Sequence, residues 1–342
     1  MKELIPIINM PSSCLLFIAP TAWGKTSLII DLFKESKINY LYLSPLRAIA
    51  EEFYHRVDLE FENAYLLSSR KDSNSIFFKT KIASPAIVIG TPELISHKIL
   101  EALGAEWIVL FDEFHLFYHW GDSFRPVLED IYISIANLNI NFIAMTATFD
   151  LKYFERWKRD ICLSYDNVFV FNLGNHCLKK MPDVQFVIPC LMKKIFLDYF
   201  KLILELPKQG GVLFFCQYRQ EVDYWLNYCS EIGVEAIGCK GGESSDFQVK
   251  YKNSRSNIIF STSVLSHGVN LKSIKYIFIS YPINNLDFWV QMVGRAGRNG
   301  EKFWLFTFDQ YYTSRRQRTT ALFRWFFHYI YLLLKYYLWL LK

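Results

Sequence analysis

Paired cysteines are missing from this sequence. Its seven cysteines stand at positions 14, 162, 177, 190, 216, 229 and 239, and no two of them are spaced as C-x-x-C. This pattern argues against a structural zinc site and against a disulfide scaffold, and it suits a reducing compartment. A typical signal peptide is missing too, because Lys2 and Glu3 precede only a short apolar run that proline interrupts. We therefore expect a cytoplasmic protein.

Charged residues are scarce. They make up 21% of the 342 residues, whereas hydrophobic residues make up 52%. This balance argues against a disordered chain and supplies apolar side chains for large cores. A chain of this length favours two domains of similar size. The formal net charge of +5 tolerates a polyanionic partner without requiring one.

The first motif has the pattern of a phosphate-binding loop. Residues 14–19 predict a buried strand and residues 27–35 predict a helix, with a Gly-Lys-Thr sequence between them. Backbone N–H groups of such a loop can bind phosphates, the lysine adds a point charge, and the threonine hydroxyl can join Mg²⁺. The predicted nucleotide-binding residues are Thr21, Gly24, Lys25 and Thr26, and Thr26 is also assigned to the metal.

Two residues of this loop depart from the usual pattern. Ala22 and Trp23 replace small, flexible residues. A tryptophan beside the phosphates would narrow the loop or stack on a neighbour. The alternative interpretation is a Gly-Lys-Thr helix start that arose by chance.

An acid pair follows the strand predicted at residues 107–111. Asp112 and Glu113 leave this buried apolar run directly. Two carboxylates at the edge of a core are costly unless they have a cationic task. In a nucleotide-hydrolysing fold one carboxylate holds Mg²⁺ and the next polarises the attacking water, so we assign Asp112 to the metal and Glu113 to the water. The alternative is a strand end whose acids cap the following helix.

Two other strand exits in the first half have a hydroxyl residue and backbone amides before a helix. The strands are predicted at residues 40–44 and 86–90, and another, at 141–145, leads into Thr-Ala-Thr. Such turns suit contact with a nucleic-acid backbone, although each is also compatible with an ordinary connection. The alternation of strands and helices predicts a mainly parallel sheet with ligands at its carboxyl edge. The predicted contacts from these turns are Pro45, Arg47, Thr91 and Pro92.

A second alternating series follows a stretch without clear periodicity at residues 151–180. We expect strands at 212–216, 234–238, 257–261 and 274–279 and a helix at 220–232. Thr262 and Gly268 follow one of these strands and suit contacts with nucleic acid and nucleotide, respectively.

The sequence Gln-Met-Val-Gly-Arg-Ala-Gly-Arg at 291–298 is the stronger signal in the second half. We expect Arg295 and Arg298 to share one face of a helix at positions i and i+3. A guanidinium directed at a γ-phosphate accelerates phosphoryl transfer strongly. The alternative is a solvated basic helix face. The predicted catalytic residues of the whole chain are Asp112, Glu113, Gln291, Arg295 and Arg298.

These motifs together resemble the RecQ-type helicases of helicase superfamily 2. The resemblance covers roughly residues 14–310 and follows the family's order: APTAWGKT, SPLRAIA, GTPELI, FDEFH, MTATF, GVLFFCQYRQ, TSVLSHGVN and QMVGRAGR. Most of these segments are shared across the superfamily. The segment at 115–126 is similar to the aromatic-rich loop with which RecQ enzymes sense single-stranded DNA, and it implies contacts by Trp120, Phe124 and Arg125. Plain core packing is the alternative for its aromatic residues.

The resemblance implies an α/β fold with two tandem RecA-like domains and mainly parallel sheets, with ATP and Mg²⁺ between the domains. We place these domains at residues 1–180 and 181–312. It implies an ATP-dependent helicase or translocase acting on single-stranded or partly duplex DNA, with His115 and Gln291 linking the γ-phosphate to the domain interface. A nucleotide-binding switch subunit is one alternative. An RNA translocase is another, because Gly-Val-Asn at 268–270 also resembles the Ski-type branch.

Parts of the RecQ pattern have no counterpart here. Thirteen residues precede the first predicted strand, so the family's adenine-recognition segment is not visible, and neither are its zinc-binding and winged-helix domains. These departures leave adenine specificity open and are compatible with a translocase or switch that needs a partner.

Residues 313–342 predict a C-terminal apolar helix. A basic cluster, Arg315, Arg316 and Arg318, precedes the apolar run. From residue 321 on, the charged side chains and the histidine fall on one narrow stripe, which consists of Arg324, His328, Lys335 and Lys342. We expect residues 319–342 to pack on the second domain or on a protein partner. A helix at a membrane surface and a membrane span are the alternatives.

Overall fold

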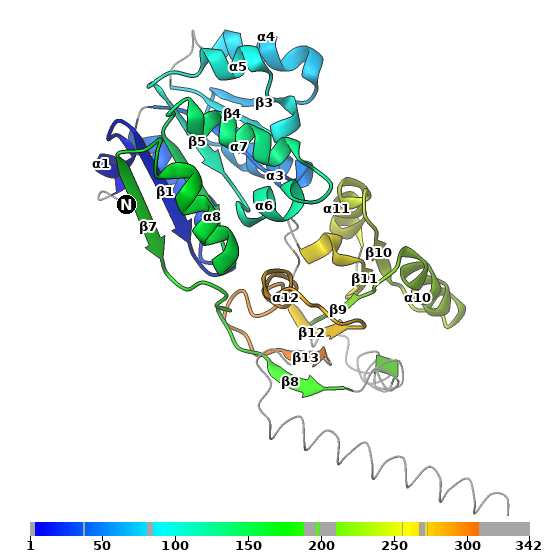
Figure 1. Ribbon diagram of the computed structural model, residues 1–342. Coiled ribbons are helices and arrows are strands. Elements are labelled where there is room, and N and C mark those ends of the chain that lie inside the picture. The colour runs from blue at the N-terminus through cyan, green and yellow to red at the C-terminus, as the bar shows by residue number, and fades with distance from the viewer. Residues whose placement is uncertain are drawn as a thin grey trace, which may run out of the picture. The chain divides into compact units, whose positions relative to one another are not determined.

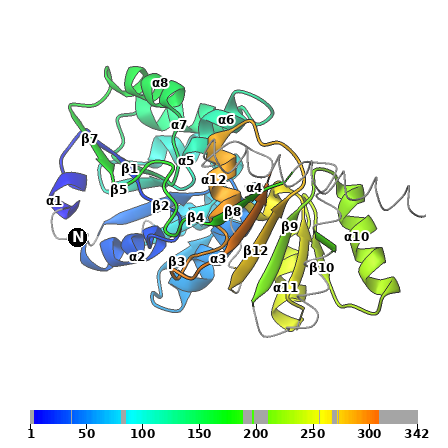
Figure 2. The same cartoon turned by 90° about the horizontal axis from the view of Figure 1, so that it is seen from below.

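The computed structural model describes residues 4–36, 38–80, 85–187, 196–197, 210–254, 256–266, 271 and 273–307 (Figures 1 and 2). The chain divides into two compact units, Met1–Leu178 and Lys179–Lys342. The predicted C-terminal helix, residues 313–342, lies outside the described residues, as does Gly268.

Unit 1 is built on a seven-stranded parallel sheet in the order β3-β4-β2-β5-β6-β1-β7. Its strands are β1 (Ser13–Ile18), β2 (Asn39–Leu43), β3 (Ala64–Leu66), β4 (Ile87–Gly90), β5 (Trp107–Phe111), β6 (Phe142–Thr146) and β7 (Asn167–Asn172). Its helices are α1 (Leu4–Ile8), α2 (Lys25–Ser36), α3 (Arg47–Asp58), α4 (Arg70–Thr80), the 3₁₀ helix η1 (Pro92–Leu94), α5 (His97–Ala102), α6 (His115–Gly121), α7 (Val127–Asn137) and α8 (Leu151–Ile161).

Two hydrophobic clusters cover the two faces of this sheet. One contains side chains from α4 to α8, such as Phe77, Leu128 and Trp157, and the other contains side chains from α1, α2 and α3, such as Ile29 and Phe53. Strands buried on both faces need apolar residues at every position, which explains the continuous apolar run of β5. The central strands therefore direct their polar exits to one edge of the sheet.

Unit 2 repeats this architecture with a six-stranded parallel sheet in the order β10-β11-β9-β12-β13-β8. Its strands are β8 (Asp183–Phe186), β9 (Gly211–Phe215), β10 (Ile237–Cys239), β11 (Ile258–Ser261), β12 (Ile274–Ile279) and β13 (Trp304–Thr307), and its helices are α10 (Arg219–Glu231), α11 (Ser244–Asn253), the 3₁₀ helix η2 (Ser263–Ser266) and α12 (Leu286–Val293). Aromatic rings pack in its core: between ring centroids, Phe214 lies 4.7 Å from Phe196, edge-on, and 5.7 Å from Phe278, stacked.

The predicted fold of two α/β domains with parallel sheets is confirmed, with some elements misjudged. No helix or strand was predicted in residues 151–180, but they contain α8 and β7. The buried residues of α8 are Tyr153, Trp157 and Ile161, which are spaced four apart on one face. β10 begins at Ile237 rather than at residue 234. In the described part of the chain, no helix combines the length and hydropathy that a membrane span requires.

Candidate nucleotide site and nucleic-acid interface

The phosphate loop connects β1 to α2. Ala19 continues the sheet, since its N–H donates to Thr146 O at 3.0 Å, and α2 begins at Lys25. The Lys25 ammonium donates to Ala19 O at 3.1 Å and to Pro20 O at 3.5 Å, so the lysine folds back over the loop. Gly24 has φ +108°, a backbone conformation that favours glycine. The strand, loop and helix thus have the local geometry that phosphate binding requires.

The two unusual loop residues adopt distinct arrangements. Ala22 has φ +59°, a left-handed conformation that costs a non-glycine residue roughly 1–2 kcal/mol. Trp23 packs edge-on against Phe17, with 5.3 Å between ring centroids, and its surface is 46% exposed. The indole therefore contacts the underlying strand and leaves part of its surface in solvent.

The acid pair is held at the carboxyl end of β5. Asp112 N–H donates to Leu43 O at 2.9 Å, its Oδ1 accepts from Glu113 N–H at 3.0 Å, and its Oδ2 accepts from the Tyr42 hydroxyl at 2.5 Å. Glu113 has φ +46°, a strained conformation for a side-chain-bearing residue. The next helix, α6, has Phe114 as its N-cap and no side-chain capping bond. The acids therefore do not cap this helix, which was the alternative interpretation of the pair.

A buried histidine connects the acid pair to the exit of β6. His115 is fully buried, and its Nδ1 lies 3.0 Å from the Thr146 hydroxyl and 3.7 Å from Glu113 Oε2. The Thr146 hydroxyl donates to Thr148 O at 2.6 Å. Because a hydroxyl has a single proton to donate, His115 Nδ1 carries the proton of its bond to Thr146. The Thr-Ala-Thr turn and the acid pair are thus joined through one imidazole.

These groups fit a nucleotide with Mg²⁺. Mg²⁺ usually keeps several waters and takes one or two carboxylates together with substrate phosphates. Among the described residues, no group of three or more histidines, cysteines or acids could hold a metal ion by itself. One carboxylate, Asp112, and one hydroxyl, Thr26, form the sparse donor set that a Mg²⁺ shared with phosphates needs.

One guanidinium joins the turns that follow β2 and β4 to the aromatic segment. Arg125 donates from Nη1 to Pro45 O at 2.7 Å and from Nε to Glu93 Oε1 at 3.0 Å, and Nη2 also contacts that carboxylate. The guanidinium carbon lies 5.3 Å from the centre of the Trp120 ring. Burial raises the pKa of Glu93, but hydrogen bonds, chiefly from Arg125, outweigh it and leave the pKa below its ordinary value. Arg125 therefore contacts three segments of unit 1 that are predicted to bind nucleic acid: the turn after β2, the turn after β4 and the aromatic segment.

The aromatic segment itself is mostly helical rather than a loop. Residues 115–121 form α6, in which Phe117 and Tyr118 are buried in the core. Trp120 is partly buried and Phe124 is 65% exposed. Core packing accounts for the buried pair, whereas Trp120 and Phe124 leave aromatic surface for a base.

The other predicted contacts of this edge differ in exposure. Arg47 at the start of α3 is exposed and pairs with Glu51, with Nε 2.7 Å from Oε1. Thr91 is partly buried and Pro92 is buried in η1. Sequence reasoning missed Tyr42 and Glu93. Tyr42 is a polar group within a buried apolar strand, and Glu93 lies three residues after the end of another.

In unit 2, the expectation that the two arginines share a helix face is wrong. α12 contains Gln291, which is buried, but it ends at Val293 with Gly294 as its C-cap. Arg295 lies in the following turn and donates to Ser266 O from Nε at 3.1 Å and from Nη2 at 2.6 Å. The glycines end the helix before either arginine is reached. Arg295 thereby ties this turn to η2.

Thr262 follows β11 directly. It is partly buried, and its N–H donates to Cys239 O at 3.1 Å, which continues the pairing of β11 with β10. The turn thus has a fixed backbone at the carboxyl edge of the second sheet.

Gly297 lets this arginine turn pack closely. It has φ +64°, and a Cβ there would lie 2.8 Å from the Phe303 ring and 2.9 Å from Lys180 Cβ. We expect Gly297→Ala to destabilise unit 2 by about 2–4 kcal/mol, since it adds overpacking to backbone strain. Gly300→Ala is the control, because Gly300 has φ +84° but open space around its Cβ position, and it should cost about 1–2 kcal/mol. Denaturant unfolding of both variants measures the difference, and equal losses would contradict the packing role.

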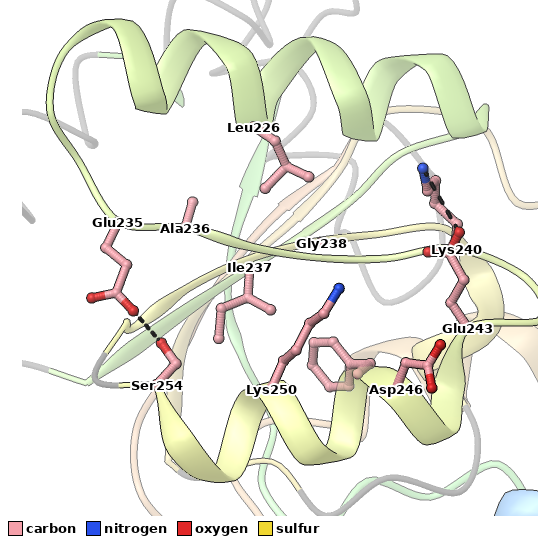
Figure 3. A pocket seen from close by; sticks show the side chains of 11 residues that line it. Leu226, Glu235, Ala236, Ile237, Gly238, Lys240, Glu243, Asp246, Lys250 and Ser254 are labelled. Atoms are coloured by element: carbon pink, nitrogen blue, oxygen red, sulfur yellow. Dashed lines mark hydrogen bonds and ion pairs between the residues drawn. The ribbon is translucent and has the colours of Figure 1, made fainter.

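A cavity of about 560 Å³ in unit 2 lies between α10 and α11 beside β10 (Figure 3). Leu226 and Ile237 supply apolar surface, and Glu235 accepts from the Ser254 hydroxyl at 2.5 Å. None of its lining residues is a predicted site residue. The cavity therefore does not mark the predicted chemistry.

Family models match both units of the chain. Residues 2–156 match the DEAD/DEAH box helicase model, and residues 194–300 match the helicase conserved C-terminal domain. The chain therefore contains a DEAD/DEAH box helicase domain followed by a helicase C-terminal domain.

Relatives of two kinds resemble this helicase core. It is 24% identical to the RecQ-like DNA helicase BLM of Xenopus laevis over 77% of the chain and 19% of the relative. It is also 24% identical to DEAD-box ATP-dependent RNA helicase 24 of Oryza sativa subsp. japonica, over 88% of the chain and 41% of the relative. The chain thus spans less than half the length of these relatives. The more specific resemblance to RecQ enzymes is one of two that the comparisons support.

Solved structures confirm the RecA-like fold of the two units. S. cerevisiae Dbp5 bound to RNA and ADP BeF3 superposes with a TM-score of 0.66 at 14% identity, covering 94% of this chain and 84% of that one. Mycobacterium smegmatis helicase Lhr bound to ssDNA and AMP-PNP gives a TM-score of 0.59 at 19% identity, covering 86% and 44%. At these identities the likeness concerns the fold.

Proposed function

We propose that this helicase core is an ATP-dependent translocase or helicase acting on single-stranded or partly duplex DNA. The observation that carries the proposal is that Glu113 Oε2 lies 3.7 Å from His115 Nδ1, which is hydrogen-bonded to the Thr146 hydroxyl, at the same sheet edge as the phosphate loop. In this arrangement Glu113 can orient the attacking water. The contacts of His115 can transmit a change at Glu113 to Thr146 at the end of β6.

The residues of unit 1 have separate tasks in this proposal. Lys25 and the loop amides bind the phosphates, with Thr21 and Gly24 shaping the loop. Thr26 and Asp112 hold Mg²⁺, which neutralises charge on the phosphates when bound. Glu113 accepts a hydrogen bond from the attacking water and orients it.

Residues of unit 2 are also assigned to the nucleotide in this proposal. Gln291 and Arg298 interact with the γ-phosphate region, and Arg295 fixes the turn between them through its bonds to Ser266 O. Gly268 belongs to the nucleotide-facing part of this unit, and Thr262 contacts the nucleic-acid backbone.

In this proposal the nucleic acid lies along the edge of unit 1 at which Arg125 contacts Pro45, Glu93 and Trp120. Backbone amides and hydroxyls near Pro45, Thr91 and Pro92 contact phosphates, and Arg47 adds an exposed positive charge. Bases stack on Trp120 and Phe124. RNA is the second candidate, because a DEAD-box RNA helicase matches over more of the chain than the RecQ-like relative does.

ATP hydrolysis without nucleic acid, with single-stranded DNA and with RNA tests the proposal. We expect single-stranded DNA to stimulate turnover more than RNA does. Stronger stimulation by RNA would support the RNA translocase. ATP binding without turnover under all three conditions would support a nucleotide-binding switch.

Coupling between strand and nucleotide depends on Trp120 in this proposal. We expect Trp120→Ala to keep the basal ATPase rate and to lose most stimulation by single-stranded DNA, because base stacking on an aromatic side chain is worth about 1–3 kcal/mol. Leu163→Ala is the control, since this side chain of unit 1 is 94% exposed and lies outside the motifs. Unchanged stimulation in the Trp120 variant would show that Trp120 only packs against Arg125 and does not couple the strand to hydrolysis.

A further inference from the structure

A tyrosine stands in the strand beside the proposed metal carboxylate. Tyr42 lies on β2, which pairs in parallel with β5, and Leu43 is opposite Phe111. The Tyr42 hydroxyl donates to Asp112 Oδ2 at 2.5 Å, while Leu43 O accepts from Asp112 N–H at 2.9 Å. Residues at the end of β2 therefore bind both the carboxylate and the backbone N–H of Asp112.

The tyrosine is itself fixed in place. It is 1% exposed and stacks on Phe53 of α3, with 4.0 Å between ring centroids and 18° between planes. Because an ionised carboxylate only accepts hydrogen bonds, the Tyr42 hydroxyl is the donor of its bond to Asp112 Oδ2. A buried hydroxyl needs a partner, and an aliphatic residue would fill the same core without that requirement. The hydroxyl is thus directed at one carboxylate oxygen by a rigid ring.

The two oxygens of Asp112 are constrained from opposite sides. Oδ1 accepts from Glu113 N–H at 3.0 Å and Oδ2 accepts from Tyr42. Two bonds to one carboxylate stop it from rotating and leave the remaining lone pairs with a defined direction. Hydrogen-bond partners of this kind orient metal ligands and typically affect metal affinity 10–100-fold.

We propose that Tyr42 is a positioning residue for the magnesium of this site, acting through Asp112. The inference rests on the proposed function, because it takes Asp112 as the metal carboxylate. It adds a residue outside the acid pair and the phosphate loop. It also ties the metal ligand to β2, whose exit turn contains Pro45 and contacts Arg125.

Direct metal binding tests this role without reference to turnover. Mn²⁺ serves as the probe, and its dissociation constant is measured by electron paramagnetic resonance with saturating ADP. We expect Tyr42→Phe to weaken Mn²⁺ binding about 10–100-fold while ADP binding without metal stays close to wild type. Should this variant not fold, Tyr42→Leu also removes the hydroxyl and is measured instead.

Tyr40→Phe is a matched control. Tyr40 lies two residues earlier on β2, is fully buried, and shares a hydrogen bond of 2.9 Å with the Ser36 hydroxyl. Both substitutions remove a buried tyrosine hydroxyl from one strand, but only Tyr42 contacts Asp112. Wild-type Mn²⁺ affinity in Tyr42→Phe, or an equal loss in Tyr40→Phe, would overturn the positioning role.

A double-mutant cycle with Asp112→Asn tests whether Tyr42 affects metal binding through Asp112. If Tyr42 acts through Asp112, Tyr42→Phe causes no further loss of Mn²⁺ affinity in the Asp112→Asn background. An additive loss would overturn the assigned route. A wild-type protein that binds ADP but no Mn²⁺ would overturn the metal site of the proposed function, and this role with it.

Discussion

Glu113→Gln is expected to reduce ATP turnover by roughly 10²–10⁴-fold while leaving nucleotide affinity close to wild type. Glutamine keeps the size and backbone preferences of the residue, so the strained φ of +46° is retained. It removes the negative charge that orients and polarises the attacking water. It also weakens the attraction to His115, whose Nδ1 lies 3.7 Å from the carboxylate. Single-turnover hydrolysis together with equilibrium ATP binding separates the two effects.

Glu106→Gln is the control for this variant. Glu106 is exposed and immediately precedes β5, whereas Glu113 follows shortly after the other end of that strand. Its substitution should change neither turnover nor binding. An intact rate in Glu113→Gln would remove this residue from the role of base, and a parallel loss of ATP affinity would indicate a binding role instead.

Apolar runs revealed most of this fold because the central strands are buried on both faces. β5 was predicted with its exact ends, Trp107 and Phe111, and β12 likewise, because all residues of β5, and all of β12 except Lys275, are buried. Parallel strands also bring their exits to one edge. The proximity of the phosphate loop, the acid pair and the Thr-Ala-Thr turn therefore followed from order and type of elements alone.

Edge elements were harder to predict because half of their residues face solvent. β7 alternates between partly buried and exposed residues along Asn167–Asn172, and its apolar run covers only the four residues Val168–Phe171. α8 buries only Tyr153, Trp157 and Ile161, and its other positions are largely polar. Their signals are weaker than those of the central strands, although the four-residue spacing in α8 was visible in the sequence.

Long-range polar contacts could not be read from the sequence at all. Arg125 was predicted as a nucleic-acid contact, but its partners within unit 1 were not foreseen: the guanidinium donates to Pro45 O, which is 80 positions away, and to Glu93, which is 32 away. The partner of a side chain depends on which loops the sheet order brings together, and that is a tertiary property. The bond between Tyr42 and Asp112, 70 positions apart, arises in the same way.

The arginine motif shows how glycines can override a helix prediction that is based on residue spacing. The i, i+3 spacing favoured one helix face, yet Gly294 ends α12 and Gly297 adopts φ +64°. Glycine is poor in helix interiors and favourable in left-handed turns. The two glycines were therefore better evidence for a turn than the arginine spacing was for a helix.

Lys25→Ala is expected to lower ADP affinity about 10–100-fold, because hydrogen bonds to charged groups contribute about 1.5–3 kcal/mol each. Lys25 opens α2 and its ammonium donates to Ala19 O and Pro20 O. These carbonyls hold the ammonium over the loop, where a bound phosphate would compete for its hydrogen bonds. The substitution removes the point charge and leaves the loop amides in place. Isothermal titration calorimetry with ADP measures the loss.

Lys34→Ala is the matched control for the charge itself. Lys34 lies near the opposite end of α2, is about half exposed and pairs with Glu60 at 2.5 Å. Both variants remove one positive charge from the same helix, so a general electrostatic effect on an anionic ligand would appear in both. A loss confined to Lys25→Ala identifies a direct phosphate contact. Equal losses in the two variants would show that net charge, rather than the phosphate loop, determines nucleotide affinity.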